Sequence, residues 1–217
     1  MDDTTNKNWI TATRGLDPSV VKIPLLYRGC IESVLLQEKD IKDRIKDLTI
    51  QIADHYGDRP FVPLVVLKGS FLVFSEIYRN LVEIYSSGKH NNMVVPEFVR
   101  LKSYKNDRKT DETMIMCLDG LDFEGKELLI IEDLIDSGGT MRTLLKVLKE
   151  VKKPKDVKIF SLAVKEGKTN FDFNVDYVGF EIPNKFCVGF GIDYNEKFRD
   201  LYCICILNQY GLDKFKV

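Results

Sequence analysis

The chain lacks the apolar runs of about 18 or more residues that a membrane-spanning helix needs. Its first ten residues, MDDTTNKNWI, also lack the positive start and apolar centre of a secretory signal. We therefore expect no membrane contact and no secretion. The expected location is the cytoplasm.

The sequence also has little net charge. Its 32 Lys and Arg residues face 33 Asp and Glu residues, which leaves a net charge of −1, and no block of basic residues stands out. A surface that binds nucleic acid needs an excess of positive charge, so we expect no nucleic-acid partner. A length of 217 residues is enough for a single domain, with or without a small hood, to bury a core.

Cysteine is sparse and irregularly spaced. The cysteines are odd in number and never form a CxxC pair: Cys30, Cys117, Cys187, Cys203 and Cys205. This pattern argues against a disulfide framework and against a zinc site. Reduced thiols in the cytosol fit the pattern better.

The most informative stretch is LLIIEDLIDSGGT, at residues 128–140. Residues 128–131 are aliphatic throughout, which is typical of a strand buried on both faces of a parallel sheet. Glu132 and Asp133 are therefore expected to emerge at the carboxyl end of that strand. Ligands bind at this edge of open α/β sheets.

A small-residue loop follows the acids. Ser137, Gly138, Gly139 and Thr140 allow consecutive backbone N–H groups to close on a phosphate, and the two hydroxyls add donors. Apolar residues at 141, 144, 145 and 148 then predict a helix, whose N-terminus favours a phosphate dianion. A Walker-type nucleotide loop is not expected, because no lysine precedes Thr140.

The remaining pattern alternates between strands and helices. Helical periodicity predicts helices at residues 41–57, 71–85 and 141–151. Apolar runs predict strands at residues 61–67, 94–101, 113–118, 157–164, 177–182, 188–192 and 202–207. This alternation predicts a parallel sheet with right-handed crossovers. Residues 1–19 are expected to be loose, and the charged segment 102–112 to be a mobile loop.

Several of these motifs together resemble those of a known enzyme family. EDLIDSGGT resembles the phosphoribosyl pyrophosphate (PRPP) motif of type I phosphoribosyltransferases. Four further segments are similar to the hypoxanthine-guanine phosphoribosyltransferases in order and spacing: VLKGS at 66–70, VRLKSYKND at 99–107, SLAVK at 161–165, and residues 176–201. The similarity runs from about residue 23 to the C-terminus.

The resemblance implies a single domain, 1–217, with the type I phosphoribosyltransferase fold. In this α/β fold, helices flank a central, mainly parallel sheet over about residues 38–180, and residues from about 20–37 and 181–217 form a hood. The implied reaction is purine salvage: the 5-phosphoribosyl group moves from PRPP to N9 of hypoxanthine or guanine, giving IMP or GMP and pyrophosphate. The implied cofactor is Mg²⁺, with two ions in the closed complex. Relatives are homodimers or homotetramers.

The resemblance also assigns the acids. Glu132 and Asp133 would meet the ribose hydroxyls and magnesium, and Asp193 would serve a second metal site and the purine site. PRPP and its 5′-phosphate would be held by Glu132, Asp133, Asp136, Ser137, Gly138, Gly139 and Thr140.

Asp136 is the implied catalytic residue, as the general base that takes the purine N7 proton. Two alternatives stay open. The carboxylate could stabilise a developing cation without moving a proton, or it could simply cap the following helix.

The purine contacts implied by the resemblance come from later motifs. Lys165 would donate to the 6-oxo group, although a lysine at a strand end more often points to water. Phe186 would stack on the base, and the backbone carbonyl of Cys187 would meet the exocyclic edge of the purine. Phe and Cys could equally be core residues.

Pyrophosphate would contact Lys68 and Gly69, beside an implied non-proline cis peptide, and the guanidinium of Arg199. Ser103 and Tyr104 would belong to a mobile lid that excludes water, although their charged neighbours also suit a solvated loop.

Three positions depart from the usual pattern. Ser137 replaces the more common threonine, Gly139 replaces a larger residue, and Ser70 replaces a second glycine. These departures could change the affinity for PRPP, but the backbone donors remain. A second hypothesis, separate from them, is a non-catalytic PRPP or nucleotide sensor on the same fold. The presence of Asp136, Lys165 and Arg199 favours catalysis.

Overall fold

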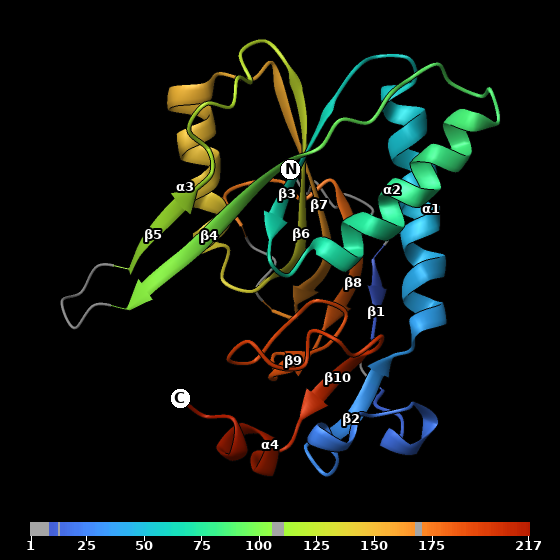
Figure 1. The fold of residues 1–217 in the computed structure, drawn as a ribbon, viewed down its shortest axis with the longest axis vertical. Helices are drawn as coiled ribbons and strands as arrows, with labels where there is room; N and C mark the ends of the chain where they lie inside the picture. The colour runs from blue at the N-terminus through green and yellow to red at the C-terminus, as the bar shows by residue number, and fades with distance from the viewer. Residues whose placement is uncertain (1–8, 13, 106–110, 168–170) are drawn as a thin grey trace, which may run out of the picture.

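The computed structural model describes residues 9–12, 14–105, 111–167 and 171–217, with the backbone alone for 102–105 and 111–114. These residues contain a seven-stranded sheet (Figure 1). Its strands, in spatial order, are β1 (Ile10–Thr11), β8 (Tyr177–Ile182), β7 (Asp156–Lys165), β6 (Glu127–Ile135), β3 (Val62–Leu67), β4 (Glu97–Lys105) and β5 (Asp111–Met116). All neighbours pair in parallel except β4 and β5. The predicted, mainly parallel α/β sheet is confirmed.

Helices cover both faces of this sheet. The helices α1 (Glu38–Tyr56) and α2 (Phe71–Ser86) lie on one face, and α3 (Gly139–Val147), continued by a π-helical turn (Leu148–Lys152), lies on the other (Figure 1). Alternate residues of β6 serve the two layers, since Leu129 packs in the cluster with α1 and α2 while Leu128 packs with α3. This double burial explains why the strand reads as a continuous aliphatic run.

The predicted amphipathic helix before residue 57 is confirmed as α1. Its buried stripe includes Ile41, Ile45 and Ile52 at helical spacing. A capping box between Gln37 and Asp40 starts the helix, and Gly57, with φ of 56°, ends it. Within the described residues, no helix is both long and apolar enough to cross a bilayer.

A second, small sheet lies beside the main one, at the bottom of Figure 1. Its order is β2 (Ile31–Leu36), β10 (Ile204–Leu207) and β9 (Cys187–Val188), all antiparallel, and α4 (Gln209–Lys214) follows. The sheet joins the segment before α1 to the end of the chain. The sequence pattern did not predict β2, because its pairing partner lies far away in sequence.

Two predicted boundaries were wrong. The strand expected at 128–131 continues to Ile135, so Glu132 and Asp133 lie inside β6 rather than beyond it. The strand expected at 188–192 stops at Val188, because the next residues, at 189–191, all have positive φ, which breaks an extended strand.

Two expected loops are partly ordered. The segment 102–112 was expected to be a loop, but β4 runs to Lys105 and pairs with β5 from Asp111 onward, because an antiparallel ladder satisfies the backbone of both segments. Residues 106–110 of that prediction lie outside the described residues. Ile10 and Thr11, expected to be loose, pair with β8 as β1.

Candidate active site

The carboxyl ends of β3 and β6 bring the first two motifs together. After β3, the Leu67–Lys68 peptide bond is cis, the conformation implied by the resemblance, and residues 68–70 turn into α2. Gly69 is buried against β6, and a Cβ there would overlap the carboxylate of Asp133. Only glycine therefore permits this close approach.

The two acids of β6 are crowded. Glu132 is only 8% exposed and accepts a hydrogen bond from Ser70 Oγ at 3.4 Å. Burial first, and then the neighbouring Asp133 carboxylate, raise the pKa of Glu132 well above its usual range. Burial also raises the pKa of Asp133, against a smaller opposing effect from Arg199. Two neighbouring acids held this way favour a bound cation.

The small-residue loop begins α3. Gly138 occupies the N-cap position with φ of 76°, a conformation that suits glycine, and a Cβ there would meet Phe171 at 2.9 Å. A Cβ at Gly139 would come no closer than 3.7 Å to Ser137 Oγ, so space remains beside the loop. Thr140 is half-buried in the first turn of the helix. The loop therefore presents a helix N-terminus at the same sheet edge.

Asp136 directly follows β6 and is exposed. Because Gly138 is the N-cap residue, Asp136 does not occupy the N-cap position, and the capping alternative is wrong. Burial and, to a smaller extent, the Asp136 carboxylate raise the pKa of the Cys187 thiol, which Lys165 opposes. Asp136 and Lys165 are therefore both near enough to Cys187 for their charges to act on its thiol.

Lys165, the last residue of β7, is only 3% exposed. Its ammonium donates to the backbone carbonyls of Pro183, at 3.3 Å, and Lys185, and it lies 3.6 Å from Cys187 Sγ. The alternative of a lysine that points to water is therefore wrong. A buried ammonium needs acceptors, and backbone oxygens supply them here.

The loop after β8 places the next two predicted residues differently. Phe186 is 60% exposed, and its ring lies edge-on to Tyr194 with 5.7 Å between centroids, so it is not a core residue. Cys187 is buried in β9 and pairs with Ile206 of β10.

The segment 189–199 closes the site from the small sheet. A Cβ at Gly191 would overlap the carbonyl oxygen of Gly69, so the two loops pack backbone to backbone. Arg199 donates to the Gly191 carbonyl at 2.7 Å and pairs with Asp193 at 2.7 Å. The structure therefore brings the predicted pyrophosphate residues to one place.

One residue that sequence reasoning missed connects them. Glu196 accepts from Lys68 Nζ at 2.9 Å and from Arg199 at 3.4 Å, and its N–H donates to Asp193 at 2.7 Å. Lys68 first, and Arg199 less, lower the pKa of Glu196. Its place between Asp193 and Arg199 in the recognised EKFRDL segment was the available signal.

Two more contributors were missed. Ser70 was treated only as a departure, yet it is fully buried and donates to Glu132. Arg142 holds the small-residue loop, because it donates to the Ser137 carbonyl at 3.1 Å and pairs with Asp172 at 2.6 Å. Neither role has a sequence signal, since both depend on contacts made in the folded chain.

The proposed lid residues lie in a strand. Ser103 pairs with Thr113 and Tyr104 with Glu112 in the β4–β5 ladder. Their expected position in an irregular loop is therefore wrong, while the intervening residues 106–110 lie outside the described residues.

No group of three or more His, Cys, Asp or Glu side chains forms a ready-made metal cage within the described part of the chain. Mg²⁺ is commonly held by one or two carboxylates together with substrate phosphates rather than by a full protein cage. The adjacent carboxylates of Glu132 and Asp133 fit that donor set.

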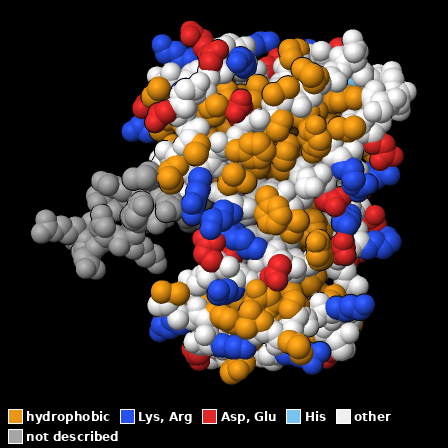
Figure 2. Space-filling model, in the orientation of Figure 1, with side chains coloured by type: hydrophobic (Ala, Val, Ile, Leu, Met, Phe, Trp, Pro, Cys, Tyr) orange, Lys and Arg blue, Asp and Glu red, His pale blue; other side chains and the backbone are white. Residues whose placement is uncertain are grey.

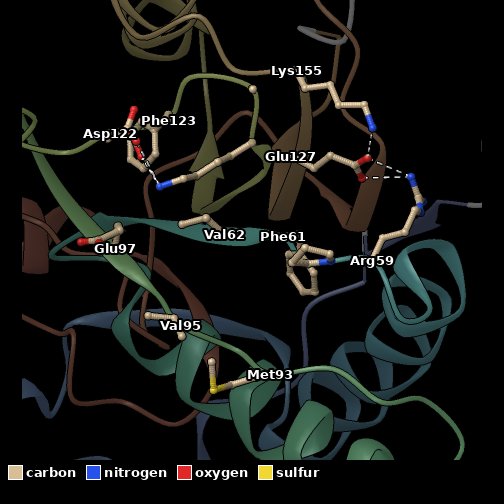
Figure 3. A pocket seen from close by; sticks show the side chains of 13 residues that line it. Arg59, Phe61, Val62, Met93, Val95, Glu97, Asp122, Phe123, Glu127 and Lys155 are labelled. Carbon is tan, nitrogen blue, oxygen red and sulfur yellow. Dashed lines mark hydrogen bonds and ion pairs between the residues drawn. The ribbon is translucent and has the colours of Figure 1, made fainter.

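A separate cavity of about 530 Å³ opens at the opposite edge of the sheet, where β3 and β6 begin. Figure 3 shows Glu127 in this cavity between Arg59 and Lys155, with Phe61 and Met93 lower on the wall. None of the predicted site residues lines it.

Comparison with known proteins decides the family. Residues 33–195 match the phosphoribosyl transferase domain. This chain belongs to the phosphoribosyltransferase family.

Relatives carry two kinds of name. The chain is 38% identical to phosphoribosyltransferase domain-containing protein 1 of Xenopus laevis over 211 residues, which are 97% of this chain and 92% of that protein. It is 37% identical to hypoxanthine-guanine phosphoribosyltransferase of Rattus norvegicus over 203 residues, which are 93% of each chain. The resemblance identified from the motifs is thus confirmed.

Solved structures agree with this assignment. The hypoxanthine-guanine phosphoribosyltransferase of Schistosoma mansoni, solved in complex with IMP, superposes with a TM-score of 0.77 at 29% identity and covers 99% of this chain and 97% of that chain. A hypoxanthine phosphoribosyltransferase from Staphylococcus aureus gives a TM-score of 0.76 at 27% identity, over 90% of this chain and 100% of that chain. The type I phosphoribosyltransferase fold is confirmed.

Proposed function

We propose that this phosphoribosyltransferase is a purine salvage enzyme, which transfers the 5-phosphoribosyl group from PRPP to N9 of hypoxanthine or guanine. The products are IMP or GMP and pyrophosphate. Relatives named hypoxanthine-guanine phosphoribosyltransferase support the substrate class. The observation that carries the proposal is Lys165, a buried ammonium at the sheet edge where the other site residues meet.

Lys165 selects the base. Two N–H groups of its ammonium already have backbone acceptors, and a purine 6-oxo group offers an acceptor to the third, whereas the amino group of adenine is a donor and offers none. Phe186 stacks on the purine with its exposed ring, and the Cys187 carbonyl meets the exocyclic edge.

Asp136 handles the purine proton. As the bond from C1 of the ribose to N9 forms, the purine N7 becomes acidic, and the carboxylate accepts its proton as a general base. Its exposed place just after β6 lets it reach a base that lies over the ribose. Stabilisation of the developing cation without proton transfer is the remaining alternative role.

The phosphates of PRPP bind at two places, the loop at residues 136–140 and the group formed by Lys68, Gly69 and Arg199. The 5′-phosphate sits at the N-terminus of α3, within residues 136–140, where backbone N–H groups and the helix dipole favour a dianion. Lys68, Gly69 and Arg199 hold pyrophosphate. Glu196 pairs with both cations here, so it leaves them when pyrophosphate arrives.

Glu132 and Asp133 would hold Mg²⁺ together with the ribose hydroxyls, and Asp193 would serve a second ion. When bound, magnesium neutralises the charge that builds on departing pyrophosphate. Ser103 and Tyr104 belong to the hairpin that covers pyrophosphate and keeps water away from the sugar cation.

The first experiment measures nucleotide formation from PRPP and Mg²⁺ with hypoxanthine, guanine, xanthine or adenine, each supplied alone. We expect turnover of hypoxanthine and guanine. Absence of turnover together with intact PRPP binding would instead support the second hypothesis, a PRPP or nucleotide sensor. Omission of Mg²⁺ tests the metal requirement in the same assay.

A second experiment isolates Lys165. Lys165→Gln removes a charged hydrogen bond to the 6-oxo group, so kcat/KM for hypoxanthine should fall roughly 10- to 100-fold. The matched control is Lys158→Gln on the same strand, because Lys158 pairs with Asp176 at 3.1 Å and lies outside the site. Equal effects of the two substitutions would contradict the role of Lys165.

We also propose that the chain assembles into a homodimer or homotetramer. Exposed hydrophobic side chains on and after α2 include Tyr78, Val82, Met93 and Val95. Figure 2 shows hydrophobic side chains gathered across the face that carries α2. A surface of this kind supports self-association. Val82→Glu should lower the mass measured by sedimentation, whereas an unchanged mass would exclude this face.

We propose a cytoplasmic location as well. The five cysteines are free thiols, which suits a reducing compartment. Cell fractionation with an antibody against the protein tests this location directly, and recovery in a membrane or secreted fraction would contradict it.

A further inference from the structure

Two thiols outside the proposed active site lie in contact. The sulfur atoms of Cys203 and Cys205 are 3.3 Å apart, and both residues are almost fully buried. Cys205 belongs to β10 and Cys203 just precedes it, so the two side chains follow the two-residue period of one face of a strand. Both cysteines belong to one buried cluster, and the short distance between their sulfur atoms is the feature that permits chemistry between them.

The two thiols differ in access. Cys203 lines a cavity of about 610 Å³ whose wall also includes Lys22, Lys39, Glu38 and Asp200. Cys205 does not line that cavity and is 0% exposed. A small molecule that enters the cavity therefore reaches Cys203 first.

The two thiols also differ in acidity. The hydrogen bond between the two thiols lowers the pKa of Cys203, with burial and the Glu38 carboxylate opposing, and it raises the pKa of Cys205. A thiolate is the nucleophile in disulfide exchange. Access and acidity thus select the same residue as the attacking group.

We propose that Cys203 and Cys205 form a redox-modification site for small-molecule disulfides. The Cys203 thiolate attacks a disulfide RSSR in the cavity, so one R–S–S–R bond breaks, a mixed disulfide forms at Cys203, and one thiolate leaves and takes a proton from water. Cys205 Sγ then attacks Cys203 Sγ, the mixed S–S bond breaks, and the Cys205 proton goes to the departing sulfur, which leaves as the second RSH. The balance is RSSR and two protein thiols in, and one protein disulfide and two RSH out.

The expected bond is reversible. Alternate residues in a strand lie roughly 6.4–6.8 Å apart at Cα, which is the upper end of the range for disulfides. The sulfur atoms must approach from 3.3 Å to about 2 Å, so the backbone near the irregular register at Ile204 and Cys205 has to shift. Such strained disulfides are readily reduced.

The dithiol is linked to the loop that carries Arg199. A Cβ at Gly189 would overlap the carbonyl oxygen of Cys203, and the Phe190 N–H donates to the Leu201 carbonyl at 2.7 Å. A shift of the backbone at Cys203 is therefore transmitted to segment 189–199. Oxidation should lower the affinity for PRPP, a consequence that rests on the proposed function.

The chemical test uses the full-length protein and glutathione disulfide. Trypsin releases residues 200–214, DLYCICILNQYGLDK, which contain both cysteines and no other. After incubation and alkylation, this peptide should lack two hydrogen atoms and carry no alkyl group, and dithiothreitol before alkylation should restore two alkylation sites. A peptide that stays fully alkylated would overturn the proposal.

Variants test the order of attack. Cys205→Ser should accumulate glutathione on Cys203, because no second thiol resolves it, while Cys203→Ser should leave Cys205 unmodified. Glutathione on Cys205 in Cys203→Ser would overturn the assignment. Cys117→Ser is the matched control, since Cys117 is exposed and distant in sequence, and it should leave the peptide disulfide unchanged.

The functional arm measures KM for PRPP before and after oxidation. It should rise in wild type, return after reduction and stay constant in Cys203→Ser. A KM that does not change in oxidised wild type overturns the link to the loop, and the peptide mass still reports the disulfide without any transferase activity. Failure of the proposed function and failure of the dithiol are therefore distinguishable.

Discussion

The two ends of β6 carry the same kind of residue in opposite settings. At the amino end, Glu127 accepts hydrogen bonds from Arg59 at 3.0 Å and Lys155 at 2.9 Å, and Lys155 above all lowers its pKa. At the carboxyl end, Glu132 has a similar exposed fraction, but burial first, and then the neighbouring acid Asp133, raise its pKa.

The difference separates stability from function along one strand. A buried carboxylate with cationic partners stabilises the fold, whereas one crowded by a second acid destabilises it until a cation arrives. We infer that the amino edge of the sheet is built for stability, while the carboxyl edge retains unfavourable charge for a ligand. Proteins commonly accept such costs at functional sites.

The largest effect is expected at Asp136. Asp136→Asn removes the proton acceptor and should lower kcat roughly 10²- to 10⁴-fold, with PRPP binding unchanged. Steady-state assays of nucleotide formation measure kcat, and calorimetric titration with PRPP measures its Kd. Near-normal turnover would remove the general-base assignment.

The next effect concerns the close approach of the turn at residues 68–70 to β6, at the carboxyl edge. Gly69→Ala places a methyl group on the Asp133 carboxylate, which should destabilise the protein by about 1–3 kcal/mol and weaken PRPP binding. Gly139→Ala is the stability control, because its methyl group finds space. Denaturant unfolding compares them, and equal losses of stability would show that the overlap is unimportant.

A pair of substitutions tests the comparison directly. Glu127→Gln should lower the free energy of unfolding by about 1–2 kcal/mol, since two exposed cations lose their partner. Glu132→Gln should raise it by roughly 0.5–2 kcal/mol at pH 7 while lowering turnover. Thermal and denaturant unfolding measure both. Changes of the same sign would break the proposed contrast.

The smallest effect is the pH dependence of the free energy of unfolding, compared between Glu127→Gln, Glu132→Gln and the wild type. Glu127 has a lowered pKa, so its stabilising effect is complete above the ordinary value of 4.5 and is lost as the pH falls through the lower folded value. Glu132 has a raised pKa, so its destabilising effect grows as the pH rises from 4.5 towards that higher value. Both variants should therefore approach wild-type stability in acid. Unfolding curves at several pH values test this convergence.

Local pattern was enough for much of the fold. The stripe of Ile41, Ile45 and Ile52 predicted α1, and the strand at 177–182 was predicted with its observed bounds, because both elements bury a periodic set of side chains. The pattern failed at β2, which depends on a partner near the C-terminus, and at 189–191, where positive φ ends the strand.

The residues of the candidate site also fall into those that the sequence predicted and those that it missed. The order of motifs named the residues at 132–140, Lys165 and Arg199, because residue types that bind phosphate or carry charge are visible in a sequence. The roles of Glu196, Ser70 and Arg142 were not visible, because each pairs with a residue distant in the chain. The partners are Lys68, Glu132 and Asp172, respectively.

The sequence by itself determined the family, the alternation of strands and helices and the chemistry available, since these follow from local periodicity and from residue types in a fixed order. Only the tertiary structure decided how charges are compensated. Glu127 meets the cations of Arg59 and Lys155, and Glu196 meets Lys68. Burial and distance set these outcomes, and both arise only when separate segments pack together.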